Sequence, residues 1–162
     1  MRLLSHVFAP DASRRFPAAT LARITSAIHA SEATHTGEVC FAVEAALPAR
    51  RVWTGVDASS RAREVFAEMG VWDTAANNGV LLYLLLADHR LEIVADRGFD
   101  GRVTQEQWRE VCVAVEGHLR DGDHEAAALA GIERLSALVA AHFPRTEGVD
   151  DIDELPNTPR IL

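Results

Sequence analysis

The stretch VWDTAANNGVLLYLLLADHRLEIVADRGFD, residues 71–100, decides the fold of this chain. The continuous apolar run at residues 80–86 predicts a central strand, and residues 91–95 predict a second strand that returns after a short turn. If the two strands pair as a hairpin, the polar loop before the first strand and the polar loop after the second lie at the same edge of the sheet. We therefore expect the loops 73–79 and 96–100 to be neighbours.

The segments on either side of this hairpin complete an α/β pattern. Residues 38–45 are mostly apolar and predict another buried strand. Helical spacing of apolar residues predicts helices over residues 17–34, after a cap at Ser59 or Ser60, after the capping-box pair Thr104 and Gln107, and after the break at residues 121–123. A strand, a crossover helix and a second strand form a right-handed parallel βαβ unit. The predicted fold is a three-layer α/β/α sandwich, with a small mixed sheet made of this unit and the antiparallel hairpin, and with helices on both faces.

Composition and charge exclude several classes of protein. The 162 residues carry a net charge of -8, which argues against nucleic acid as a ligand because phosphate backbones are bound by clustered positive charge. The longest apolar run, residues 79–87, is too short to span a bilayer, and the first 16 residues lack the apolar core of a signal peptide. Cys40 and Cys112 lie far apart in apolar runs, which predicts two buried free thiols in a reducing compartment. We expect a cytoplasmic protein with no direct membrane span, peripheral to a membrane complex if it meets one.

The end of the chain differs in composition from the rest. The length and composition of residues 1–145 predict one domain. Residues 146–162, in contrast, are acidic, contain proline and show no periodicity. We expect a flexible acidic tail. The alternative is an extended arm that docks on a neighbour through Leu155, Ile161 and Leu162.

The converging loops form a candidate site for a divalent cation. Ca²⁺ and Mg²⁺ prefer oxygen ligands from carboxylates, amides and backbone carbonyls. The loops provide such groups, and Glu38, which begins the first predicted strand, is expected to border the same cleft. The candidate ligands are Asp73, Asn77, Asn78, Asp96 and Asp100. The alternative is that both loops are ordinary turns in which Gly79 and Gly98 serve the backbone conformation.

Catalytic signatures are incomplete. A cysteine phosphatase needs an arginine six residues after its cysteine, and the residues at that distance from Cys40 and Cys112 are Ala46 and His118. The sequence contains no GxGxxG, GxxxxGK[ST], HExxH or GxSxG motif. No complete catalytic set follows from these residues.

Four marks between residues 17 and 143 give the chain a family resemblance. They are Thr36-Gly37-Glu38, residues 62–70 (AREVFAEMG), NNGVLLYLLL and IVADRGFD. With this spacing the chain resembles the TPM domain family, and the tail segment 154–157 resembles that of its soluble bacterial branch. The resemblance implies an α/β/α sandwich with a cleft that binds divalent cations, notably calcium, in some relatives. Many relatives have Asp-Asn-Gly where this chain has Asn77-Asn78-Gly79, so we expect weaker cation binding here.

Two functions follow from the resemblance. The first is a protein-interaction or envelope-maintenance module that works beside membrane-associated proteins, with a Ca²⁺ or Mg²⁺ cleft shaping its surface. The alternative is a cation-dependent acid phosphatase-like hydrolase that acts on phosphomonoesters, because some relatives are credited with that activity.

Overall fold

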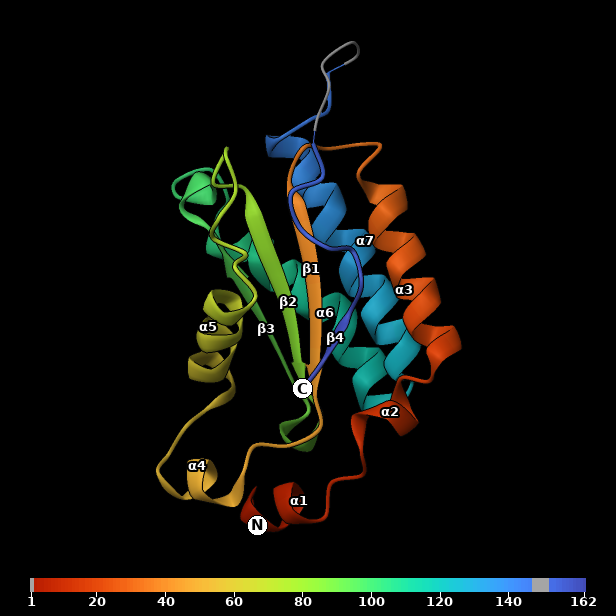
Figure 1. Cartoon of the computed structure of the whole chain (residues 1–162), viewed down its shortest axis with the longest axis vertical. Helices are drawn as coiled ribbons and strands as arrows, with labels where there is room; N and C mark the ends of the chain where they lie inside the picture. Colours follow the sequence, from red (N-terminus) through yellow and green to blue (C-terminus); the bar gives the residue numbers. More distant parts are fainter. Residues whose placement is uncertain (1, 147–151) are drawn as a thin grey trace.

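A computed structural model describes residues 2–146 and 152–162 and shows a sheet between two layers of helices (Figure 1). The predicted α/β/α sandwich is confirmed. The elements follow in the order α1 (Arg2–Val7), α2 (Ala12–Arg15), α3 (Ala18–Ser31), β1 (Glu38–Glu44), α4 (Ala49–Trp53), α5 (Ala58–Glu68), β2 (Gly79–Leu85), η1 (Leu86–Asp88), β3 (Arg90–Ala95), η2 (Arg97–Phe99), α6 (Gln105–Asp121), α7 (His124–His142) and β4 (Arg160–Ile161).

The described part of the sheet has the strand order β3-β2-β1-β4. β1 and β2 pair in parallel, with Glu38 opposite Gly79 at their start, and α5 lies in the crossover between them. β2 and β3 pair antiparallel, with Val80 opposite Ala95, after a turn in which His89 adopts a left-handed conformation. The predicted βαβ unit and hairpin are therefore both present.

Alternating side chains of β1 and β2 form two cores on opposite faces of the sheet. Every residue of both strands is buried, as their continuous apolar runs predicted. On one face, side chains such as Phe41 and Leu82 pack against α3, α6 and α7. On the other face, side chains such as Leu81 and Tyr83 pack against α5. The sheet is thus held rigidly from both sides, and its edges position the loops.

Local signals explain most of the helix ends. Thr104 and Gln107 form the predicted capping box at the start of α6. Asp57, rather than Ser59 or Ser60, caps α5, and its carboxylate accepts a hydrogen bond from the Ser60 N–H. Helix α3 is shorter than the predicted 17–34. The short helices α1, α2 and α4 lie in segments for which no helix was predicted, because four to six residues carry too little periodicity to be recognised.

Part of the C-terminal segment, for which a flexible tail was expected, packs on the sheet. Within residues 152–162, β4 pairs in parallel with β1, and Leu155 and Leu162 pack on the α5 face of the sheet. Of the three residues foreseen for a docking arm, Leu155 and Leu162 pack on the chain itself, whereas Ile161 is 38% exposed. The physical reason is that β1 would otherwise leave one edge unpaired. The part of the predicted tail at residues 147–151 lies outside the described residues.

Two further expectations concern cysteines and membrane spans. Both cysteines are free, as predicted, but only Cys40 is buried, whereas Cys112 on α6 is partly exposed. No helix in residues 2–146 or 152–162 combines the length and the apolar character needed to cross a membrane.

Candidate functional site

The candidate site lies at the edge of the sheet where β1 and β2 begin and β3 ends, at the top of Figure 1. The backbone N–H of Asp96 donates to the carbonyl of Gly79 at 2.9 Å, and the N–H of Glu38 donates to the carbonyl of Asn78 at 3.2 Å. The three strand ends are thereby joined through the residues that flank the predicted cleft.

The two polar loops contact each other directly, as the hairpin predicted. The Gly98 N–H donates to the Asn77 carbonyl at 2.8 Å. The Arg97 guanidinium donates from Nε to Oδ1 of Asn77, also at 2.8 Å. Asn77 has a left-handed backbone with φ 52°, which asparagine tolerates better than most residues. The hairpin therefore brings Asn77 and Asn78 to the segment that begins with Asp96.

Among the described residues, Asn78 and Asp96 each leave one buried side-chain oxygen without a hydrogen-bond donor. The Asn78 amide donates from Nδ2 to the carbonyl of Thr36 at 2.8 Å, but its Oδ1 has no partner. Asp96 caps η2 by accepting from the Arg97 N–H at Oδ1, and its Oδ2 has no partner. Buried oxygens of this kind are rare, and each costs roughly 1–3 kcal/mol unless something binds it.

The other two candidate ligands are less closely held. Asp73 and Asp100 are exposed, and no described contact joins either carboxylate to Asn77, Asn78 or Asp96. Within the described residues there is also no group of three histidine, cysteine, aspartate or glutamate side chains arranged to hold a metal. A cation at this edge would therefore need amide and backbone oxygens as well as carboxylates.

Comparison with known proteins assigns the chain to a family. The family model described as the TPM domain matches residues 10–138. The chain belongs to the TPM domain family. Its fold is similar to the NMR structure of the BA42 protein from the psychrophilic bacterium Bizionia argentinensis, with a TM-score of 0.77 and 29% identity over 89% of this chain and 93% of that one. A search of curated proteins gave no significant match.

The C-terminal arm of this TPM domain reaches the same edge, which the sequence did not indicate. Both carboxylate oxygens of Glu154 accept a hydrogen bond from the Ala75 N–H at 3.1 Å, in the loop 73–79. The Glu154 N–H in turn donates to Oε1 of Glu38 at 3.0 Å. Nothing in the spacing of residues 146–162 could place Glu154 here, because the contact depends on β4 pairing with β1.

Glu38 has a strongly perturbed titration. Burial raises the pKa of Glu38 from 4.5 to about 7, and the hydrogen bond from the Glu154 backbone opposes this shift only in part. The nearby Asp153 carboxylate raises the pKa of Glu38 further. The folded domain therefore keeps a proton on Glu38 at pH values where the unfolded chain has lost it.

We expect the stability of the TPM domain to fall as the pH rises from about 4.5 to about 7, because unfolding releases the proton of Glu38 in that window. Well above pH 7, where Glu38 is deprotonated in the folded domain as well, this contribution is constant. After allowance for partial solvent screening, the loss is about 1–2 kcal/mol. Urea denaturation at pH 5 and pH 8 measures it.

Glu38→Gln should remove the Glu38 contribution, leaving those of Glu32, Glu92 and His124, whose pKa values are also shifted. It should be more stable than the wild type at pH 8, since the amide keeps an oxygen for the Glu154 N–H. The matched control is Glu110→Gln, at an exposed position of α6, which should retain the wild-type pH dependence. If the unfolding free energy of Glu38→Gln fell with pH as steeply as that of the wild type, Glu38 would not be the cause of the pH dependence.

Proposed function

We propose that this TPM domain is an interaction module whose sheet edge at residues 73–79 and 96–100 binds one divalent cation, Ca²⁺ or Mg²⁺. The observation that supports this most directly is the pair of buried oxygens, Asn78 Oδ1 and Asp96 Oδ2, that lack hydrogen-bond donors within the described part of the chain. They belong to loops joined by the bond between Gly98 and Asn77. A hard cation would satisfy such oxygens, and a carboxylate and an amide are suitable ligands for it.

The charge of the proposed site sets its expected strength. Asp96 contributes one negative charge, whereas Asn77 is neutral and its side-chain oxygen is already bonded to the Arg97 guanidinium. The exposed carboxylates of Asp73 and Asp100 can approach a bound ion only by moving with their loops. We therefore expect a dissociation constant on the order of 10⁻⁴–10⁻³ M, in the range of weak calcium sites.

We favour an interaction module over the phosphatase-like alternative because this edge, as far as the structure describes it, offers no prepared nucleophile. Burial raises the pKa of the Cys40 thiol to about 12, so it stays protonated and does not act as a thiolate. Arg97, which could otherwise hold a phosphate, is bonded to Asn77. A bound cation would instead fix the conformation of loop 73–79, where Ala75 and Ala76 are exposed for a partner protein.

A calcium titration followed by backbone NMR tests the cation site. We expect shifts confined to residues 73–79 and 96–101 in the wild type. Asp96→Asn should weaken calcium binding at least tenfold, because it removes the charge of the carboxylate and keeps the shape of the side chain. The matched control is Asp121→Asn, at the exposed C-terminal end of α6, which should bind as the wild type does.

Two results would contradict the proposal. One is the absence of shifts at these loops at 10 mM (about ten times the weakest expected dissociation constant) of either Ca²⁺ or Mg²⁺. The other is equal loss of affinity in Asp96→Asn and Asp121→Asn, which would indicate general attraction of cations to an acidic protein.

A further inference from the structure

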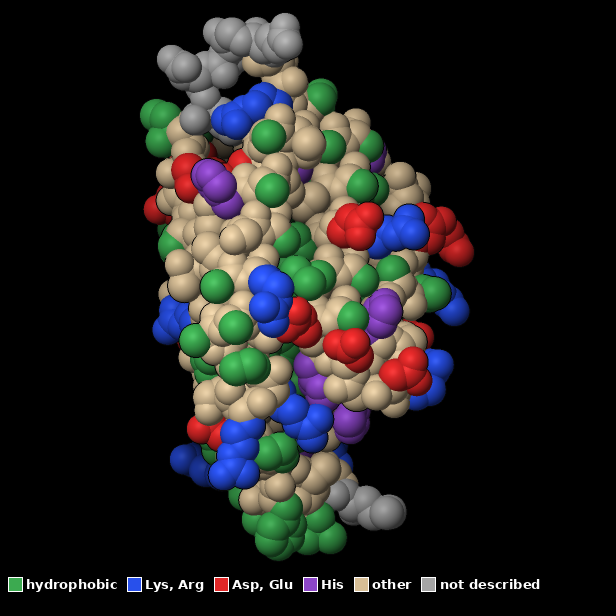
Figure 2. Space-filling view, turned by 90° about the vertical axis from the view of Figure 1, so that its right-hand side faces the viewer, with side chains coloured by type: hydrophobic (Ala, Val, Ile, Leu, Met, Phe, Trp, Pro, Cys, Tyr) green, Lys and Arg blue, Asp and Glu red, His purple; other side chains and the backbone are tan. Residues whose placement is uncertain are grey.

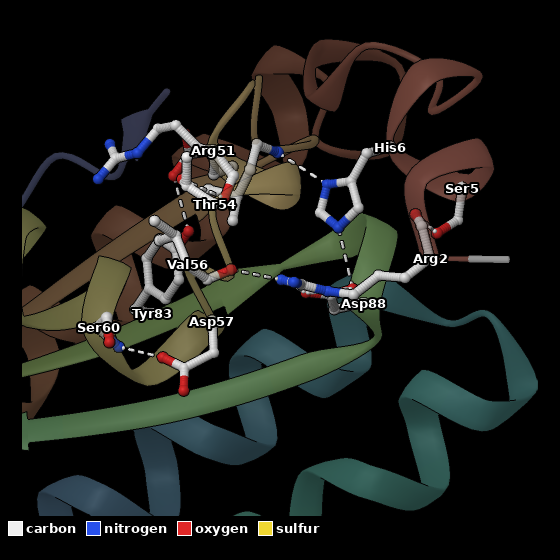
Figure 3. A network of polar contacts seen from close by, with 12 residues as sticks. Arg2, Ser5, His6, Arg51, Thr54, Val56, Asp57, Ser60, Tyr83 and Asp88 are labelled. Carbon is white, nitrogen blue, oxygen red and sulfur yellow. Dashed lines mark hydrogen bonds and ion pairs between the residues drawn. The ribbon is translucent and has the colours of Figure 1, made fainter. Parts of the chain in front are cut away.

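Helix α1 is attached to the protein by its polar side, at the end of the molecule opposite the proposed cation site (Figures 1 and 3). The Arg2 guanidinium donates to Asp88 Oδ2 and to the Val56 carbonyl, both at 2.8 Å. The buried His6 ring lies 3.0 Å from Asp88 Oδ1 through Nε2, and its Nδ1 accepts from the Leu47 N–H at 2.9 Å. These bonds fix which side of α1 faces outward.

The outward side of α1 is apolar. Leu4, Val7 and Phe8 follow one another at helical spacing, and their exposed fractions are 61%, 56% and 77%. The neighbouring helix α4 adds Trp53, which is 84% exposed. A surface helix of a globular protein normally turns this side inward. The reversed orientation leaves Leu4, Val7 and Phe8 in solvent, and we call these three side chains and the exposed Trp53 of α4 the apolar tip.

Three exposed arginines lie on α2 and α4, the helices drawn nearest to α1 in Figure 1, although the chain as a whole is acidic. Arg14 and Arg15 on α2 and Arg50 on α4 are exposed, and none of them forms an ion pair within the described residues. Figure 2 shows apolar side chains gathered at the lower end of the molecule with a group of arginines directly above them. These arginines concentrate positive charge on a chain whose net charge is -8, although the exposed Asp121 and Asp123 border the same hollow as Arg14 and Arg15.

We propose that the apolar tip docks on an anionic phospholipid surface. Leucine, valine and phenylalanine can enter the boundary between headgroups and acyl chains, and tryptophan is favoured at that depth. Arginines beside them are attracted to anionic headgroups. The negative charge of the remaining surface orients the molecule with this end toward the membrane and the cation site away from it.

Charge complementarity favours lipid over a second copy of the chain. A symmetric contact between two apolar tips would bring two sets of unpaired arginines together, which is unfavourable. An anionic lipid layer supplies the opposite charge, and it is flat enough to meet a convex tip. This inference is independent of the proposed cation site, which lies at the other end of the sheet.

Co-sedimentation of the full chain with vesicles tests the proposal. We expect binding to vesicles of phosphatidylcholine with 30% phosphatidylglycerol, and at least tenfold weaker binding to phosphatidylcholine alone (about the effect of losing several arginine–headgroup attractions). The double variant Leu4→Asp/Phe8→Asp should lose at least tenfold in affinity (roughly, two anchors fewer). Its matched control is Trp72→Asp/Val113→Asp, which adds the same charge at two exposed apolar positions away from the tip.

The arginines are tested separately. Arg14→Gln/Arg15→Gln should weaken binding to the anionic vesicles and reduce its dependence on salt. The control Arg109→Gln/Arg120→Gln removes the same charge from exposed positions on α6 and should leave binding nearly unchanged. Far-UV circular dichroism and thermal unfolding of every variant show that the fold is retained.

Three results would overturn the proposal. The first is no sedimentation with anionic vesicles at low salt. The second is an equal loss of vesicle binding in Leu4→Asp/Phe8→Asp and in its control Trp72→Asp/Val113→Asp. The third is a dimer, found by sedimentation equilibrium without lipid, that Leu4→Asp/Phe8→Asp dissociates, since this would assign the tip to a second copy of the chain.

Discussion

Arg61→Met should destabilise the domain by about 3–5 kcal/mol, because it leaves the buried carboxylate of Glu44 without its cation. Both residues are buried, and Arg61 Nε donates to Glu44 Oε2 at 2.8 Å. The same oxygen accepts from the hydroxyl of Tyr83 at 2.7 Å, and burial, together with this hydrogen bond, strongly raises the pKa of Tyr83. Glu44 lies in β1 and Tyr83 in β2, so the loss falls on the central strand pair.

Thermal unfolding measures this effect, and a decrease in Tm of about 10 °C is expected. The matched control is Arg63→Met, on the exposed side of the same helix, where the guanidinium donates only to Ser59 among the described contacts. It should change stability by less than about 0.5 kcal/mol.

A double variant separates the unpaired charge from lost packing. Glu44→Gln removes the buried charge and keeps an oxygen for Tyr83, so Arg61→Met/Glu44→Gln should be more stable than Arg61→Met alone. If the stability losses of Arg61→Met and Glu44→Gln simply added in the double variant, the ion pair would not be the reason for the destabilisation.

The architecture could be predicted from the sequence because buried strands and helices have apolar residues in recognisable runs or periods. The continuous apolar runs of β1 and β2 and the stripe of α6 identify the elements without any tertiary information. Once the β2–β3 hairpin is recognised, the meeting of Asn77 with the Asp96 segment follows from antiparallel pairing alone.

The features that sequence reasoning missed depend on contacts between distant segments. Glu154 reaches Ala75 only because β4 pairs with β1, and a two-residue strand has no detectable pattern. The outward side of α1 is equally hidden, since its apolar residues alone would predict burial. The bonds from Arg2 and His6 to Asp88 reverse its orientation, and Asp88 is remote in sequence.

Gly98→Ala should separate the two loops of the proposed cation site. A Cβ atom at residue 98 would lie 2.3 Å from the Asn77 carbonyl oxygen and 3.0 Å from that of Ala76. Both are backbone atoms, which cannot move aside as a side chain does. The hydrogen bond from the Gly98 N–H to Asn77 would also be lost or strained. We expect destabilisation of about 2–3 kcal/mol, typical of overpacking.

The change should also weaken calcium binding by more than its effect on stability explains, because Asn78 and Asp96 would no longer be held at one edge. Calcium titrations under conditions where the variant is fully folded distinguish the two effects. The matched control is Gly117→Ala in α6, where a Cβ meets nothing within 4 Å and the new residue favours the helix by about 0.5–1 kcal/mol. It should be as stable as the wild type or more so, with unchanged affinity. A Gly98→Ala protein that binds calcium as tightly as the wild type would mean that the close approach of the two loops does not form the site.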